Sequence, residues 1–265
     1  MRIKGLSKGS RAVKLFWLFT ALALFSGCAA LITHLLAHEL FGWSSTVHRE
    51  RREIELSEQI SISSADIPLS VYTHNGDKII VEYKGETALI IEETDLELRI
   101  GREEDFALSL FSMDKLNYEM KVWLPEYSYK EIKLTTASGD IYAEKIRAEL
   151  TAVTSRSGDV SLYGVEGLIA VNTRYGDVNA EFINFTDSCA IDVETGAVSV
   201  IMPTRFDVKL DFLTASGLFT SDFFRKEYYL HAGDLYLSTG VNSIRFTVRT
   251  VSGNLDFHKR DETVG

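Results

Sequence analysis

The pattern of apolar and polar residues repeats along the second half of the chain. About every twenty residues the sequence returns to a small residue, a glycine, an acid and an apolar residue, as in TTASGDIY (135–142), TSRSGDVS (154–161) and NTRYGDVN (172–179). Apolar side chains stand five positions before and two positions after each glycine. Between these positions the residues alternate with a period of two, which predicts β-strands with one buried face.

The glycines that anchor these units are 16 to 21 residues apart, a period typical of a solenoid. Positions −5, −3 and −1 before the glycine and +2 and +4 after it are predicted to face inward. Because this order changes parity at the glycine, the chain must bend there. Glycine tolerates a positive φ, and aspartate can accept bonds from nearby amides. The predicted corner residues are Gly139, Asp140, Gly158, Asp159, Gly176, Asp177, Gly196, Gly217, Gly233, Asp234 and Gly253.

The repeat predicts an all-β solenoid whose successive coils stack about 4.8 Å apart, with 134–258 as the regular coils. Inside, columns of Thr and Ser are expected to exchange hydroxyl bonds. Residues 50–133 alternate less regularly and are interpreted as divergent coils and an N-terminal cap, in which Gly76 echoes the corner. An exposed insertion is expected at 102–117 and a tail at 259–265. A β-sandwich is the rival fold.

The N-terminal segment predicts a membrane anchor. Residues 15–36 contain no Asp, Glu, Lys or Arg and would span about 33 Å as a helix. Five bases and no acid precede them, which places 1–14 in the cytoplasm and the body, after a linker at 37–49, outside the cell. A cleaved signal peptide and lipidation at Cys28, within LFSGC, are alternatives. We favour a single-pass helix in the cell membrane because the sequence stays apolar after Cys28.

Charge limits the partners of the body. The 265 residues carry a formal net charge of −10, and beyond residue 14 there are 23 basic and 38 acidic residues. Such a surface is ill suited to nucleic acid. A disulfide between Cys28 and Cys189 would have to join the predicted membrane segment to the distant body, so we do not expect one.

The membrane segment, the VWLP strand end and the serial T-x-S-G-D-[IV] units together resemble the bacterial "putative adhesin" β-strand-repeat family, a domain of unknown function, over roughly 50–258. The resemblance implies a right-handed, single-stranded β-helix on a bacterial surface. The corner acid of the pattern is missing at Ala197 and Leu218.

Several groups of side chains are candidate sites. The stacked corner acids, with Asn254, could bind calcium or serve only as turn residues, and we favour the turn. His34 and His38 share a helical face but lack a third ligand. Arg156, Arg174 and Glu194 align as a ladder that could meet an anion or only form surface ion pairs. The tyrosines that could line a carbohydrate face are Tyr127, Tyr129, Tyr142, Tyr163 and Tyr175.

No catalytic, cofactor or metal site is predicted. The expected function is a non-catalytic binding, scaffolding or envelope-sensing module whose partner is a cell-envelope protein or glycan. The alternative is a polysaccharide lyase or hydrolase on a β-solenoid, which would need clustered acids and a cleft formed by long loops.

Overall fold

The computed structural model describes residues 47–85, 87–94, 97–102, 118–203, 206–224, 226–239 and 243–260. These residues form nineteen β-strands and no helix, within one compact unit, Val47–Gly265. None of the described residues belongs to a helix able to cross a membrane. The predicted membrane segment 15–36, with Cys28, His34 and His38, lies outside the described residues, as do 103–117 and 261–265.

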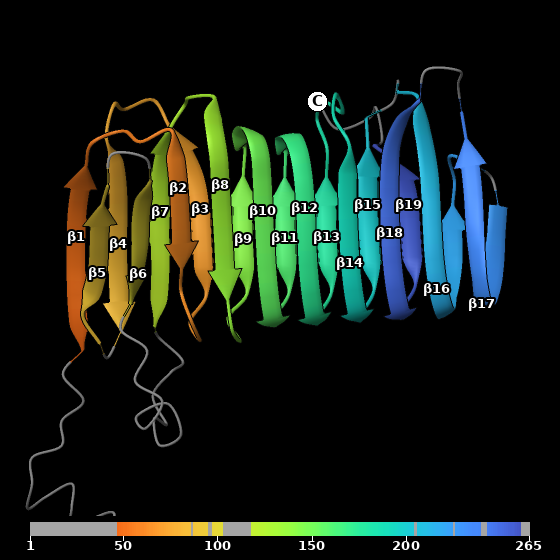
Figure 1. Cartoon of the computed structure of the whole chain (residues 1–265), viewed down its shortest axis with the longest axis horizontal. Helices are drawn as coiled ribbons and strands as arrows, with labels where there is room; N and C mark the ends of the chain where they lie inside the picture. Colours follow the sequence, from red (N-terminus) through yellow and green to blue (C-terminus); the bar gives the residue numbers. More distant parts are fainter. Residues whose placement is uncertain are drawn as a thin grey trace, which may run out of the picture. The chain divides into compact units, whose positions relative to one another are not determined.

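One set of strands forms the first face of the stack, in front in Figure 1. Its inner members pair in parallel, and only the outermost pairs, β5–β6 and β16–β17, are antiparallel. In spatial order the strands are β5 (Leu89–Glu93), β6 (Leu98–Arg102), β2 (Gln59–Ser63), β8 (Tyr129–Thr136), β10 (Arg147–Ser157), β12 (Glu166–Tyr175), β14 (Cys189–Thr195), β18 (Ile244–Ser252), β16 (Val208–Ser221) and β17 (Lys226–Ser238).

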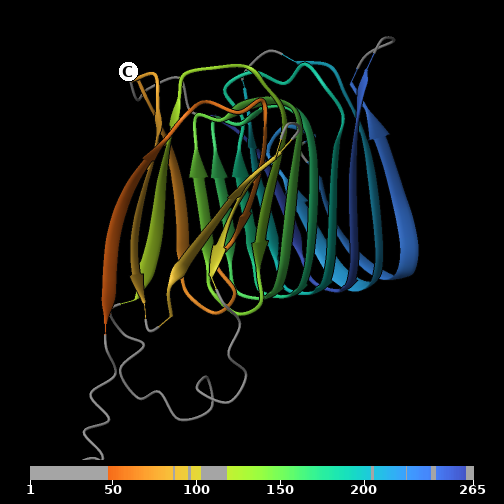
Figure 2. The same cartoon turned by 60° about the vertical axis from the view of Figure 1, so that its left-hand side comes forward.

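A second set forms the opposite face, which Figure 2 shows as a separate layer. From β7 onward its strands are parallel, and β1 and β4 add an antiparallel end. The order is β1 (His48–Ile54), β4 (Ile79–Gly85), β7 (Glu119–Pro125), β3 (Leu69–His74), β9 (Ile141–Glu144), β11 (Val160–Tyr163), β13 (Val178–Glu181), β15 (Val198–Met202) and β19 (Leu255–Lys259), followed by the end of β16, which pairs with β19.

The chain therefore winds between two stacked faces, as the predicted all-β solenoid requires, and the core lies between them. In the coil of Gly158, Val153 and Ser155 before the corner are buried, as is Val160 after it. Ser157, at position −1, is exposed, and the same position is never buried in the other coils of the column. The prediction that position −1 faces inward was wrong, because the alternation already breaks at the end of the strand, where Arg156 and Ser157 are both exposed.

The interior hydroxyl column is only partly the predicted ladder. Thr250 Oγ1 donates to Thr214 Oγ1 of the neighbouring coil at 2.8 Å. Elsewhere the column bonds mainly to backbone at the corner: Thr136 donates to Ala65 O (2.9 Å) and Ser155 to Gly158 O (3.3 Å). Ala65 O also accepts from the backbone amide of Ser138 at 3.1 Å, whereas Thr173 Oγ1 in the same column has no partner among the described residues.

The order of the coils differs from the order of the sequence. The β18–β19 coil lies between the β14–β15 coil and β16, although β16 and β17 precede it in the chain. At the other end the β2–β3 coil pairs directly with β8 and β9. The coils share the same pattern of buried positions, so this pattern does not determine which coils are neighbours, and the stack does not follow chain order.

Gly233 and Asp234, which were predicted to form a corner, and Gly76, which was predicted to resemble one, do not lie in the corner column. Gly233 and Asp234 are inside β17, where Gly233 lies opposite Thr214 in an antiparallel hairpin. The alternation of that hairpin strand imitates the repeat, but the strand does not turn a corner. Gly76 lies between β3 and β4, and a Cβ there would meet only the nearby His74 ring.

Candidate functional site

The remaining corner glycines form one column along the stack. A Cβ added to any of them would lie closer than 3.0 Å to the backbone carbonyl oxygen of the corner beneath it. The column runs Ile67, Gly139, Gly158, Gly176, Gly196, Gly253 and Gly217. Gly176 also has a φ of +136°, which L side chains rarely adopt. The corners are therefore places where backbones approach too closely for a side chain.

The corner acids form a hydrogen-bonded ladder. Asp140 Oδ1 accepts from Asp159 N (2.9 Å), Asp159 Oδ1 from Asp177 N (2.8 Å), and Asp177 Oδ1 from Ala197 N (2.7 Å). Asn254 Oδ1 does the same for Leu218 N at 3.0 Å. Each side chain thus caps a backbone amide of the adjacent coil. No cluster of His, Cys, Asp and Glu suited to a metal occurs among the described residues.

Four aromatic rings form a continuous row on the outside of the second face. Ring centroids are 5.9 Å apart for Trp123 and Tyr72, 5.5 Å for Tyr72 and Tyr142, and 5.3 Å for Tyr142 and Tyr163. These four residues, here called the aromatic row, project from β7, β3, β9 and β11 and are half-buried. Neighbouring rings are inclined by 28° to 45°, so they partly cover one another.

Tyr142, in the middle of the aromatic row, has a hydrogen-bonded hydroxyl group. Tyr142 donates its hydroxyl hydrogen to Glu144 Oε2 at 2.9 Å. Burial, followed by the Glu144 carboxylate, raises the pKa of Tyr142 to about 12. The phenol therefore stays neutral near pH 7 and remains a hydrogen-bond donor.

Of the five tyrosines predicted to line a face, only Tyr142 and Tyr163 belong to the aromatic row. Tyr129 is buried and donates to Pro125 O at 3.0 Å, and Tyr127 packs edge-on against it. Tyr175 is 46% exposed at a first-face corner. Sequence reasoning missed Tyr72 and Trp123, because finding them requires the pairing of β3 with β7 and β9. Their outward position in alternating strands was the available signal.

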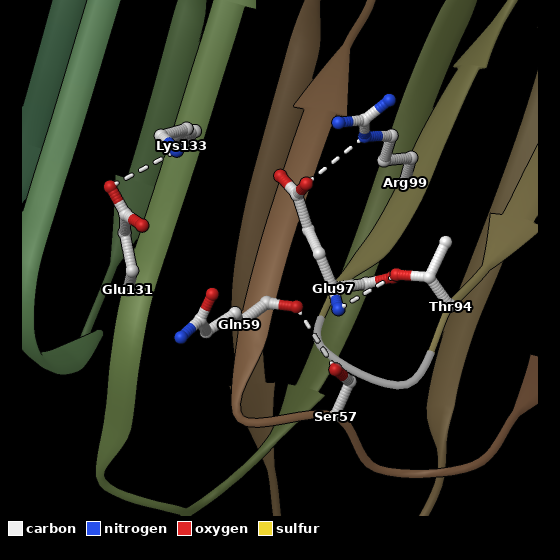
Figure 3. Close-up of polar contacts among 7 residues, drawn as sticks. All are labelled: Ser57, Gln59, Thr94, Glu97, Arg99, Glu131 and Lys133. Carbon is white, nitrogen blue, oxygen red and sulfur yellow. Dashed lines mark hydrogen bonds and ion pairs between the residues drawn. The ribbon is translucent and has the colours of Figure 1, made fainter.

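A shallow depression of about 590 Å³ lies at the chain-start end of the first face. Its lining residues are Leu56, Ser57, Glu58, Gln59, Glu93, Thr94 and Lys130. Figure 3 shows its polar surroundings, where Glu97–Arg99 (3.0 Å) and Glu131–Lys133 (3.2 Å) pair on strands either side of β2.

Two carboxylates of the first face, those of Glu58 and Glu166, have lowered pKa values. Lys130 bonds Glu58 and lowers its pKa, and Arg147 does the same to Glu166. A glycosidase acid needs the opposite shift, to a raised pKa. In the predicted arginine ladder, Arg174 pairs with Glu194 at 2.7 Å, as a surface ion pair does.

Residues 122–257 match the family model described as Toastrack DUF4097. No curated protein matches the chain. Solved structures that resemble it include a "putative cell adhesion protein" from Clostridium sporogenes (15% identity, 81% of this chain and 100% of that chain, TM-score 0.49) and a "putative adhesin" from Bacteroides fragilis (10%, 80% and 97%, 0.36). A "putative lipid binding protein" from Parabacteroides distasonis aligns at 11% identity over 81% and 97%, with a TM-score of 0.24.

Proposed function

The chain belongs to the Toastrack DUF4097 family, and on that premise we propose that it is a non-catalytic binding module whose aromatic row contacts a protein of the cell envelope. The observation that carries this proposal is the row itself: four adjoining rings that remain half-exposed on a flat sheet face. Aromatic side chains are enriched where proteins meet, and Tyr offers both apolar area and a hydroxyl.

The arrangement of the rings favours a protein over a glycan as partner. Because neighbouring rings overlap along the stack, much of each ring face is already covered, and mainly ring edges and hydroxyl groups are left to a partner. No residue of the row lines either depression described here: one lies on the first face, and the other is lined by residues of β1, β4 and β7. A flat aromatic surface suits a protein interface better than an enclosed small-molecule site.

We also propose that residues 15–36 hold this module in the cell membrane, with residues 1–14 in the cytoplasm. The support is the uncharged run of 22 residues behind five bases. Replacing Cys28 by Ser should leave the protein membrane-bound at unchanged size. A heavier precursor in that variant, or fatty-acid labelling of the wild type, would show that Cys28 is lipidated. Right-handed winding of the coils is part of the same proposal.

Site-specific photo-cross-linking on intact cells tests the function. A benzophenone amino acid replaces Tyr163 in the aromatic row or, as the matched control, Tyr175, which is 46% exposed on the other face. We expect a discrete protein adduct from position 163 only, and its loss when Tyr72 is also changed to Ala.

Two results would contradict this function. Equal adducts from positions 163 and 175 would show that the aromatic row is not the specific contact surface. Glycan binding that depends on Tyr72, without any protein adduct, would replace the protein partner by a glycan. Turnover of cell-wall or plant polysaccharides by the purified chain would instead favour the lyase or hydrolase alternative.

A further inference from the structure

A second depression, of about 270 Å³, lies on the outside of β1, β4 and β7, at the chain-start end of the second face. It is lined by Arg49, Glu50, Arg51, Glu82, Tyr83, Lys84, Glu119 and Lys121. Four bases thus face three acids, in a chain whose formal net charge is −10. This part of the surface is locally positive.

Two of these bases lie side by side, and neither forms an ion pair with a described residue. Arg49 and Lys84 are direct partners across the antiparallel β1–β4 ladder. Neither makes an ion pair or a side-chain hydrogen bond to another described residue. Like charges directly opposite each other across a ladder destabilise a sheet. Their juxtaposition is therefore an unfavourable feature that a bound anion would relieve.

The acids nearby are already engaged. Glu82 pairs with Arg51 at 3.0 Å, and Glu119 pairs with Lys121 at 2.8 Å. Although Glu119 lies opposite Lys84 in the β4–β7 ladder, its ion pair runs along its own strand. Neutralisation of Arg49 and Lys84 is thus left to something outside the described chain.

We propose that Arg49 and Lys84 bind a phosphate group in this depression. The guanidinium of Arg49 presents paired N–H donors that match two phosphate oxygens, and the Lys84 ammonium supplies a second charge beside it. No residue of the aromatic row lines this depression, which borders the row at β7. A phospholipid headgroup and a soluble phosphate ester share this chemistry, and the experiment below distinguishes them.

The first arm uses the full chain in a neutral detergent. Addition of sn-glycerol 3-phosphate, with sodium chloride adjusted to constant ionic strength, should raise Tm saturably, by about 3–6 °C at ten times the dissociation constant. Arg49→Gln with Lys84→Gln should abolish this rise. That variant should be no less stable than wild type without ligand, because the like-charge contact is gone.

Arg99→Gln is the matched control, since Arg99 is an exposed cation on the first face that already pairs with Glu97. It should keep the full response to glycerol phosphate. An equal Tm rise in the Arg49–Lys84 variant would overturn the site, as would a wild type that responds neither to glycerol phosphate nor to the lipid of the second arm.

The second arm tests a lipid source. Trp17→Phe and Trp43→Phe leave Trp123, two residues from Lys121 on β7, as the sole tryptophan. The chain is reconstituted in phosphatidylcholine vesicles with or without bromine-labelled phosphatidylglycerol. Quenching of Trp123 by the labelled phosphatidylglycerol, lost in the Arg49–Lys84 variant, identifies a headgroup as the source. A Tm response to glycerol phosphate without quenching identifies a soluble ester, and quenching that survives the variant contradicts the site.

Discussion

At the scale of the residue, backbone crowding accounts for the corner glycines more generally than backbone torsion does. A positive φ occurs at Gly158, Gly176 and Gly196, whereas the close approach of a neighbouring carbonyl is common to the whole column. The hydrogen-bonding partner of each corner acid is likewise the adjacent coil. The repeated Ser-Gly-Asp corner motif is thus determined by contacts between coils as much as by the turn within one coil.

Gly176→Val should be strongly destabilising, by about 3 kcal/mol or more, because its Cβ would meet Gly158 O and a β-branched residue resists φ of +136°. Urea denaturation measures the free energy of unfolding. Asn179→Val, at an exposed position three residues later, is the control and should change it by less than about 0.5 kcal/mol. Equal effects from the two variants would contradict the column.

Asp159→Ala should cost about 1 kcal/mol, because Asp177 N loses its acceptor. Asp159→Asn should be close to neutral, since Asn254 already fills the same role with an amide oxygen. Calcium should leave Tm unchanged in all three proteins. A calcium-dependent Tm that only the aspartate form shows would mean that the ladder binds the cation after all.

Tyr142 should make the stability of the protein depend on pH in the alkaline range. Its folded pKa of about 12 lies above the unfolded value near 10, so its contribution is complete below pH 10 and is lost as the pH rises towards 12. Tyr142→Phe should therefore flatten the fall in unfolding free energy between pH 10 and 12. An unchanged slope would mean that the phenol is not shielded as the structure indicates.

At the scale of the element, the sequence predicts strands and corners well and their neighbours poorly. Val153 and Val160 show the buried alternation directly, because side-chain period is a local property. The place of β18 between β14 and β16 is not local, and every coil offers the same inward columns. The aromatic row was half missed for the same reason, since Tyr72 and Tyr142 are 70 residues apart in the chain.

Cysteine pairs can test the order of the coils. In a Cys28→Ser background, Asp192→Cys with Arg249→Cys should form a disulfide, because these positions are direct partners between β14 and β18. Asp192→Cys with Leu213→Cys should not, although stacking in chain order would pair those two. Non-reducing electrophoresis after mild oxidation and mass spectrometry distinguish the outcomes, and the reverse result would restore the sequential order.

At the scale of the whole molecule, each coil is stabilised almost entirely by the two beside it, as in a one-dimensional array. Strand β11 has a partner on each side, whereas β1 pairs only with β4 and β17 only with β16 among the described strands. Amide hydrogen exchange should accordingly be slowest in the β9–β13 region and fastest at both ends. Uniform protection from end to end would indicate a single cooperative unit instead.

The place of β18 and β19 also has a consequence in time. A ribosome makes β16 and β17 before β18, yet β16 reaches the rest of the stack only through β18 and β19. Until β18 and β19 have been made, the β16–β17 hairpin lacks its neighbours in the stack. Phe212 and Phe219, which are buried in the complete fold, are then exposed to solvent. This part of the core can close only when β18 and β19 have been made. A nascent chain that stalls before β18 would present an uncovered apolar surface to chaperones and proteases, so the order of the strands in the stack delays the closing of this part of the core.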